Sequence, residues 1–156
     1  MKRLRICSLK EAMDYRNDEV VERFMGNYEI SKAQAEQFFL ETKKWVWLLA
    51  SASQDRKLGQ HVPRLVIDNY LIFIDEMWHN FILFTKDYQE YCNDKFGFFI
   101  HHNPTPQKIK VALREEMNSD KGLERIFGVR KEQYSYIYDR LGGETLELWY
   151  GKMCDQ

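Results

Sequence analysis

The chain has 156 residues, of which 44% are hydrophobic and 30% charged, and a formal net charge of −1. This length predicts a single domain over residues 1–156, large enough to bury a core. The near-neutral charge gives no attraction to nucleic acid or to an acidic membrane surface, so we expect neither as a partner. The longest apolar runs, such as Trp45–Ala50, are far shorter than a membrane-spanning helix.

The N-terminus and the cysteines predict a cytoplasmic, soluble protein. The basic start, residues 1–10, is not followed by the apolar segment of a secretory signal. Cys7, Cys92 and Cys154 are an odd number without a CxxC pair, which is typical of reduced thiols in the cytosol.

Two serine-based capping boxes begin the predicted helices of the N-terminal third. Ser8 with Glu11 opens a helix that runs to about Met25, and Ser31 with Gln34 opens the next one. The second helix has an apolar stripe of Ala35, Phe38, Thr42, Trp45, Val46 and Leu49. The polar residues that follow, 51–60, are predicted to form a surface loop.

A central helix is predicted next, with Pro63 in its first turn. Its apolar residues recur at steps of three and four, which marks one buried face made of Leu71, Ile74, Trp78, Phe81 and Ile82. Trp78 lies at the centre of this face, so we expect it to be buried. A shorter helix follows from the N-cap Thr85, and Gly97 is expected to end it in the left-handed conformation.

The remaining chain continues the helical pattern. Thr105 and Pro106 predict the start of one helix, and residues 119–121 a turn. A short helix is expected to stop at Gly128, and a further one at Gly142. We take the tail from Thr145 as one more helical turn. The predicted fold class is therefore all-α, a single compact domain of about six or seven helices.

Histidines gather in and after the central helix, and they suggest a metal site. Asp75 and His79 lie one helical turn apart, the spacing that helical ligand pairs use. The candidate ligands for zinc or iron are Asp75, His79, Cys92, His101 and His102. The alternative is that Asp75 only pairs with His79 within the helix. No serine elbow, phosphate loop or dinucleotide motif is present, so a non-enzymatic role is favoured.

Aromatic residues suggest a surface for another protein. A helix cannot bury Tyr134, Tyr136 and Tyr138 together, so at least one ring should be exposed. Trp47 lies off the apolar stripe and is either a wide core contact or an exposed anchor. Tyrosine and tryptophan are enriched at binding hot spots, so these four residues are the candidate partner-binding set.

Consecutive apolar residues predict self-association. Residues 38–40 and 45–49 are apolar without a break, so one helix face cannot hold them all. The apolar residues outside that face must be covered either by neighbouring helices or by another chain. If another chain covers them, a two-fold homodimer is the commonest arrangement.

The run D-E-M-W-H-N-F-I-L-F-T-K-D-Y, with His101-His102-Asn103-Pro104, resembles small bacterial proteins related to the glycine-rich-domain-protein-like family. Their D-x-x-W-H motif, which is often followed by x-H, falls on Asp75, Trp78 and His79, but Phe81 stands at the position of the second histidine. The resemblance implies a shared fold unit, without an activity. Our leading interpretation is a non-enzymatic helical module that binds and regulates or inhibits another protein. The alternative is a zinc or iron protein with its site at His79, Cys92, His101 and His102.

Overall fold

The structure, a computed structural model, describes residues 6–152. Over this range it is helical and contains no strand, which confirms the all-α prediction. Eight α-helices occur in these residues, slightly more than the six or seven predicted. Cys7 and Cys92 are free thiols, and Cys154 lies outside the described residues.

The helices follow in this order: α1 (Leu9–Met13), α2 (Asp18–Tyr28), α3 (Lys32–Lys57), α4 (Ile72–Leu83), α5 (Thr85–Lys95), α6 (Gln107–Glu116), α7 (Asp120–Leu141) and α8 (Gly143–Glu147). A 3-10 helix, η1 (Asn69–Leu71), leads into α4, and a π-helix, η2 (Leu148–Lys152), follows α8. No helix of residues 6–152 is long and apolar enough to cross a membrane.

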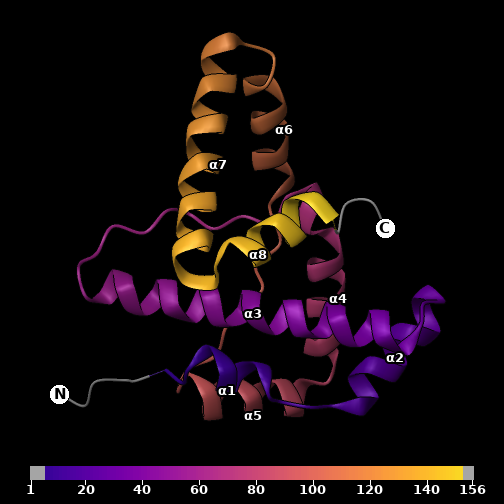
Figure 1. Cartoon of the computed structure of the whole chain (residues 1–156). Coiled ribbons are helices and arrows are strands. Elements are labelled where there is room, and N and C mark those ends of the chain that lie inside the picture. The colour runs from indigo at the N-terminus through magenta and orange to yellow at the C-terminus, as the bar shows by residue number, and fades with distance from the viewer. Residues whose placement is uncertain (1–5, 153–156) are drawn as a thin grey trace.

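Helix α3 is the central element of the fold. It crosses the molecule with α1 and α5 on one side and α8 on the other, while α6 and α7 protrude as a hairpin (Figure 1). Helices α1, α2, α4 and α7 all pack against it. The consecutive apolar residues of α3 are therefore covered largely by the same chain, and Phe38, Phe39, Trp45, Val46 and Leu48 are buried. This packing removes the reason given above for a dimer through α3.

Helix α3 begins as predicted and ends later. The Ser31 side chain accepts a hydrogen bond from the Gln34 backbone N–H, and the Gln34 side-chain oxygen accepts one from the Ser31 backbone N–H. The helix then continues to Lys57, so the predicted loop over residues 51–60 is wrong for most of its length. Asp55 explains the continuation, because its buried carboxylate accepts hydrogen bonds from Tyr136 and Arg140 of α7.

The predicted first helix is divided in two. Ser8 caps α1 as expected, but the helix ends at Met13 and α2 begins at Asp18. The side chain of Asn17 causes the break, because its oxygen caps the Val20 N–H and its amide donates to Asp87 of α5. A contact between residues 70 positions apart therefore decides this boundary.

Two other predicted boundaries are wrong. Pro63 does not lie in the central helix, because the chain stays non-helical until Asp68 caps η1. Helix α7 does not stop at Gly128 but runs unbroken from Asp120 to Leu141. A glycine inside a helix costs only about 1 kcal/mol relative to alanine, which the rest of this long helix tolerates.

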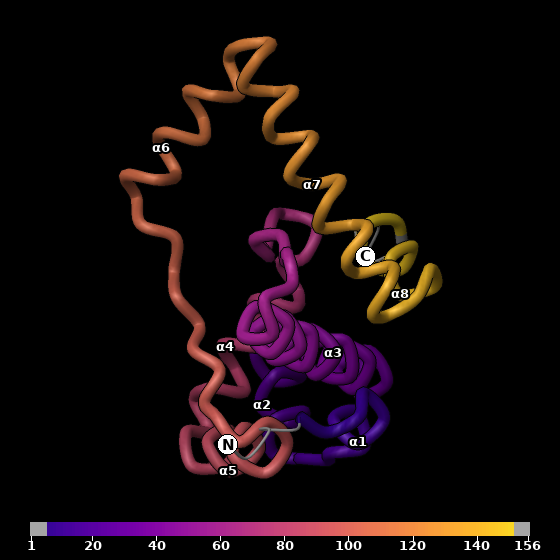
Figure 2. Tube along the Cα trace, turned by 90° about the vertical axis from the view of Figure 1, so that its left-hand side faces the viewer, coloured from indigo at the N-terminus to yellow at the C-terminus, as the bar shows by residue number. Residues whose placement is uncertain are grey.

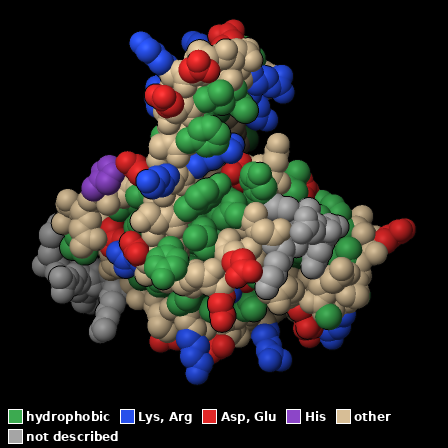
Figure 3. Space-filling view, turned by 45° about the horizontal axis from the view of Figure 1, so that its top comes forward, with side chains coloured by type: hydrophobic (Ala, Val, Ile, Leu, Met, Phe, Trp, Pro, Cys, Tyr) green, Lys and Arg blue, Asp and Glu red, His purple; other side chains and the backbone are tan. Residues whose placement is uncertain are grey.

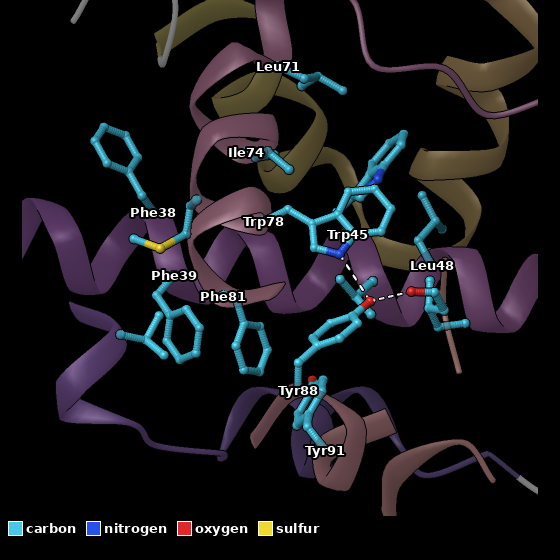
Figure 4. Packing of buried hydrophobic residues seen from close by; sticks show 14 of the residues in the cluster. Phe38, Phe39, Trp45, Leu48, Leu71, Ile74, Trp78, Phe81, Tyr88 and Tyr91 are labelled. Carbon is cyan, nitrogen blue, oxygen red and sulfur yellow. Dashed lines mark hydrogen bonds between the residues drawn. The ribbon is translucent and has the colours of Figure 1, made fainter. Parts of the chain in front are cut away.

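The core between α3, α4 and α5 is aromatic. Trp78 is 4% exposed, which confirms its predicted burial. Its indole N–H donates to the Tyr88 hydroxyl at 3.0 Å, and that hydroxyl donates to the Ile100 carbonyl at 2.5 Å. Figure 4 shows Trp78 of α4 reaching toward Tyr88 of α5 through the first of these bonds. The chain after α5 is thereby attached to the core at Ile100.

Candidate metal centre

Helix α4 presents two of the predicted ligands beside its buried face. Ile74, Met77 and Trp78 point into the core, while Asp75 is half-buried and the His79 side chain is 53% exposed. The Asp75 Oδ2 and His79 Nδ1 atoms lie 3.9 Å apart, as the one-turn spacing predicts.

The third member of the cluster comes from the segment after α5. Along this segment exposure alternates, so Ile100 is buried, His101 is exposed and His102 is partly buried. The His102 Nε2 atom lies 2.7 Å from Asp75 Oδ1, and its side chain is 12% exposed. The His102 ring is held between the rings of Trp78 and His79, each with its centroid 4.2 Å away.

The Asp75 carboxylate is stabilised in its charged form. The hydrogen bond with His102 lowers the pKa of Asp75 below its usual value, and burial opposes this shift. The positive charge of Lys110 also favours the carboxylate. An anionic oxygen and two imidazole rings thus lie together at the surface.

The structure brings three of the five predicted ligands together. Ligand atoms of Asp75, His79 and His102 all lie within 4.8 Å of one another. Cys92 and His101 are outside this cluster. Cys92 is on the inner face of α5, where burial raises the pKa of its thiol, and His101 packs its ring on Phe99 instead.

A carboxylate and two imidazoles form a donor set for a divalent transition metal and leave further coordination positions open. An imidazole nitrogen binds an ion that lies in the plane of its ring. The His79 and His102 rings are stacked, with an angle of 12° between their planes. Binding both rings to one ion therefore requires a rotation, and the exposed His79 is the ring that is free to turn.

A groove of about 550 Å³ opens beside the cluster, which forms part of its wall. Its other walls include Trp45 of α3, Arg64 from the segment before α4, and Lys110 of α6. The indole Nε1 of Trp45 is the single buried side-chain nitrogen or oxygen without a hydrogen-bond partner in the described part of the chain. The apolar periodicity of the sequence indicated Trp45 only as a core residue, and no sequence pattern indicated Arg64 as a site residue.

The predicted partner-binding residues lie elsewhere. Tyr138 is 59% exposed, which confirms that α7 leaves one of its three tyrosines on the surface. Tyr136 donates its hydroxyl to Asp55, and Tyr134 packs against Tyr150. Trp47 is half-buried, and its indole N–H donates to the Cys7 carbonyl at 3.0 Å.

Comparison with known proteins identifies a family. The family UCP032817-like matches residues 29–140, which include Asp75, His79 and His102. No curated protein matches the chain, and no solved structure does. The resemblance to glycine-rich-domain-protein-like proteins stays a prediction. The matched region begins just after α2 and extends almost to the end of α7, and the chain belongs to the UCP032817-like family.

Proposed function

We propose that this protein binds one divalent transition-metal ion, zinc or iron(II), through Asp75, His79 and His102. The observation that supports the proposal most directly is that these three ligand groups meet within 4.8 Å, although they come from two separate segments. Imidazole and carboxylate ligands together suit zinc and iron(II).

The surroundings of the cluster also suit a metal site. The hydrogen bond from Tyr88 to Ile100 and the contact with Trp78 hold His102 in place before an ion arrives. Such outer contacts orient ligands and raise the affinity of metal sites. The open coordination positions would face the groove, where an ion acts as a Lewis acid toward whatever binds there.

Metal analysis of tag-free protein tests the proposal. We expect about one equivalent of ion per chain after incubation with zinc or, anaerobically, with iron(II) and removal of the excess. His79→Ala should weaken binding by more than about 100-fold, because loss of an outer-shell partner alone costs 10- to 100-fold. His79 is exposed, so this variant should fold normally.

His61→Ala is the matched control, because His61 is an exposed histidine that pairs with Glu132 of α7 and is not part of the ligand cluster. It should bind the ion as the wild type does. Equal binding by His79→Ala and the wild type, or no binding by either, would overturn the proposal.

We also propose a protein-binding role for the α6–α7 hairpin, with a second copy of the chain as its partner. Helix α6 buries none of its residues, and the exposed apolar residues of the hairpin are Ile109, Val111, Leu113, Met117, Phe127 and Val129. Figure 2 shows that α6 and α7 separate below their turn, and Figure 3 shows hydrophobic side chains on the hairpin among charged ones. Two such hairpins would cover each other as a four-helix arrangement with two-fold symmetry.

Sedimentation velocity at micromolar concentration tests the dimer. Phe127 is 62% exposed, so Phe127→Ser should fold normally and shift the protein from dimer to monomer. Leu83→Ser is the control, because Leu83 is as exposed, at 63%, but lies at the end of α4. A wild-type monomer over the whole concentration range would contradict this second proposal.

A further inference from the structure

The groove beside the metal centre has the size of a small-molecule site. Its volume of about 550 Å³ falls within the roughly 300–1,000 Å³ of ligand pockets. It is bounded by three separate parts of the chain, namely α3, residues 64–79 and residues 101–110. Apolar walls come from Leu49, Leu65, Ile67 and Ile72.

The charges of this groove favour an anion once a divalent ion is bound. Arg64 and Lys110 supply two positive side chains, and Asp68 and Asp75 supply two negative ones. The two charges of the ion then make the groove positive. Lys110 is close enough to Asp75 to lower the pKa of its carboxyl, so an anionic oxygen on the ion would also have Lys110 near it.

A second feature of the groove, the indole of Trp45, calls for a hydrogen-bond acceptor on the ligand. The Trp45 side chain lines the groove and is 1% exposed, and its Nε1–H has no acceptor in the protein. A buried donor without a partner costs about 1–3 kcal/mol. The Trp45 Nε1 atom has almost no accessible surface, so a ligand oxygen would reach it only after a small shift of the indole, and would then remove that penalty.

We infer that the groove binds a small organic carboxylate that carries a second oxygen acceptor, such as an oxo acid. The carboxylate lies between the metal ion and the side chains of Lys110 and Arg64. The carbon chain lies along the apolar walls, and the second oxygen accepts the Trp45 N–H. This inference rests on the proposed metal site.

The test uses the full-length protein loaded with cobalt(II), whose visible absorption reports occupancy of the metal site. Binding of hexanoate, 5-oxohexanoate and hexanol is then measured by calorimetry and by quenching of tryptophan fluorescence, since Trp45 and Trp78 both line the groove. We expect 5-oxohexanoate to bind at least about tenfold more tightly than hexanoate, as one hydrogen bond to a buried donor implies. Hexanol should not bind.

Variants of Lys110 and Trp45 test the contacts at the two ends of the ligand separately. Lys110→Met should weaken both acids by at least about fivefold, whereas Lys108→Met, in the same exposed helix but outside the groove, should have no effect. Trp45→Phe keeps a ring in the core but lacks the N–H, so it should abolish the preference for 5-oxohexanoate and leave hexanoate binding unchanged.

Each other result contradicts a stated part of the inference. Cobalt binding without binding of either acid would overturn the inference and leave the metal proposal standing, whereas absence of cobalt binding would overturn both. Equal effects of Lys110→Met and Lys108→Met would refute the proposed contact between the ligand carboxylate and Lys110. A preference for 5-oxohexanoate that survives in Trp45→Phe would refute the role of the indole.

Discussion

Asp75 Oδ1 and His102 Nε2 are joined by a hydrogen bond of 2.7 Å, although 27 residues separate the two side chains along the chain. This bond connects α4 to the segment that follows α5. It also places the carboxylate between two imidazole rings, since His79 Nδ1 lies 3.9 Å from the other carboxylate oxygen. The stability of the site and its capacity for metal therefore depend on the same carboxylate.

The Asp75–His102 bond predicts a pH dependence of stability in the metal-free protein. The pKa of Asp75 is lowered from 3.8, mainly by this hydrogen bond. A carboxyl whose pKa is depressed by folding stabilises the folded state above its unfolded pKa, and that contribution is lost as the pH falls through the folded pKa. We expect Asp75→Asn to cost about 1–2 kcal/mol at pH 7.

Urea unfolding with a chelator present, at pH values from 7 down to 3, measures this effect. The difference in unfolding free energy between the wild type and Asp75→Asn should shrink as the pH falls below 3.8. A difference that stays constant over this range would mean that the carboxylate charge does not contribute.

Trp78 is predicted to be a major contributor to the core. It is 4% exposed and bonded to Tyr88, so Trp78→Ala should lower the free energy of unfolding by about 3–5 kcal/mol. Leu83→Ala on the same helix is the control, because Leu83 is 63% exposed and its truncation should change stability by no more than about 0.5 kcal/mol. Chemical denaturation compares the two, and equal small effects would contradict the burial of Trp78.

Two glycines should respond to alanine in opposite directions. Gly97 has φ = 78°, the left-handed conformation predicted for the end of α5, so Gly97→Ala should destabilise by about 1–2 kcal/mol. Gly128 lies inside α7, and an added Cβ would meet nothing within 4 Å. Gly128→Ala should therefore stabilise by about 0.5–1 kcal/mol. Thermal unfolding of both variants checks the signs, and a stabilising Gly97→Ala would refute the strain argument.

Lys43 predicts a second pH dependence, at alkaline pH. Its ammonium group is buried and donates to the carbonyl oxygens of Met13 and Tyr15, and burial lowers its pKa from 10.5 to about 8. Between these two values the unfolded chain binds more protons than the folded one at this site, so Lys43 makes stability rise with pH. Lys43→Met should lack this rise.

The measurement is the difference in unfolding free energy between the wild type and Lys43→Met at pH 8, 9 and 10. Taking the difference removes the contributions of tyrosines and cysteines that titrate in the same range. A difference that falls with rising pH would contradict the assignment.

The local parts of this structure were predictable from the sequence. The Ser31–Gln34 capping box, the buried face of α4 and the one-turn spacing of Asp75 and His79 are all present. Each depends on residues within one or two turns of a helix, and helical geometry alone relates such residues. The positive φ of Gly97 belongs to the same class, because a left-handed helix end favours glycine wherever it occurs.

Contacts between distant segments decided the end of α3 and the composition of the ligand cluster. Asp55 extends α3 through a region whose polar composition predicted a loop, because its partners Tyr136 and Arg140 come from α7. Which residue joins Asp75 and His79 was equally undetermined, since His101, His102 and Cys92 all suit a metal by type. The hydrogen bond from Tyr88 to the Ile100 carbonyl fixes Ile100 in the core, so that His101 faces solvent and His102 faces α4. No local pattern in the sequence encodes this hydrogen bond.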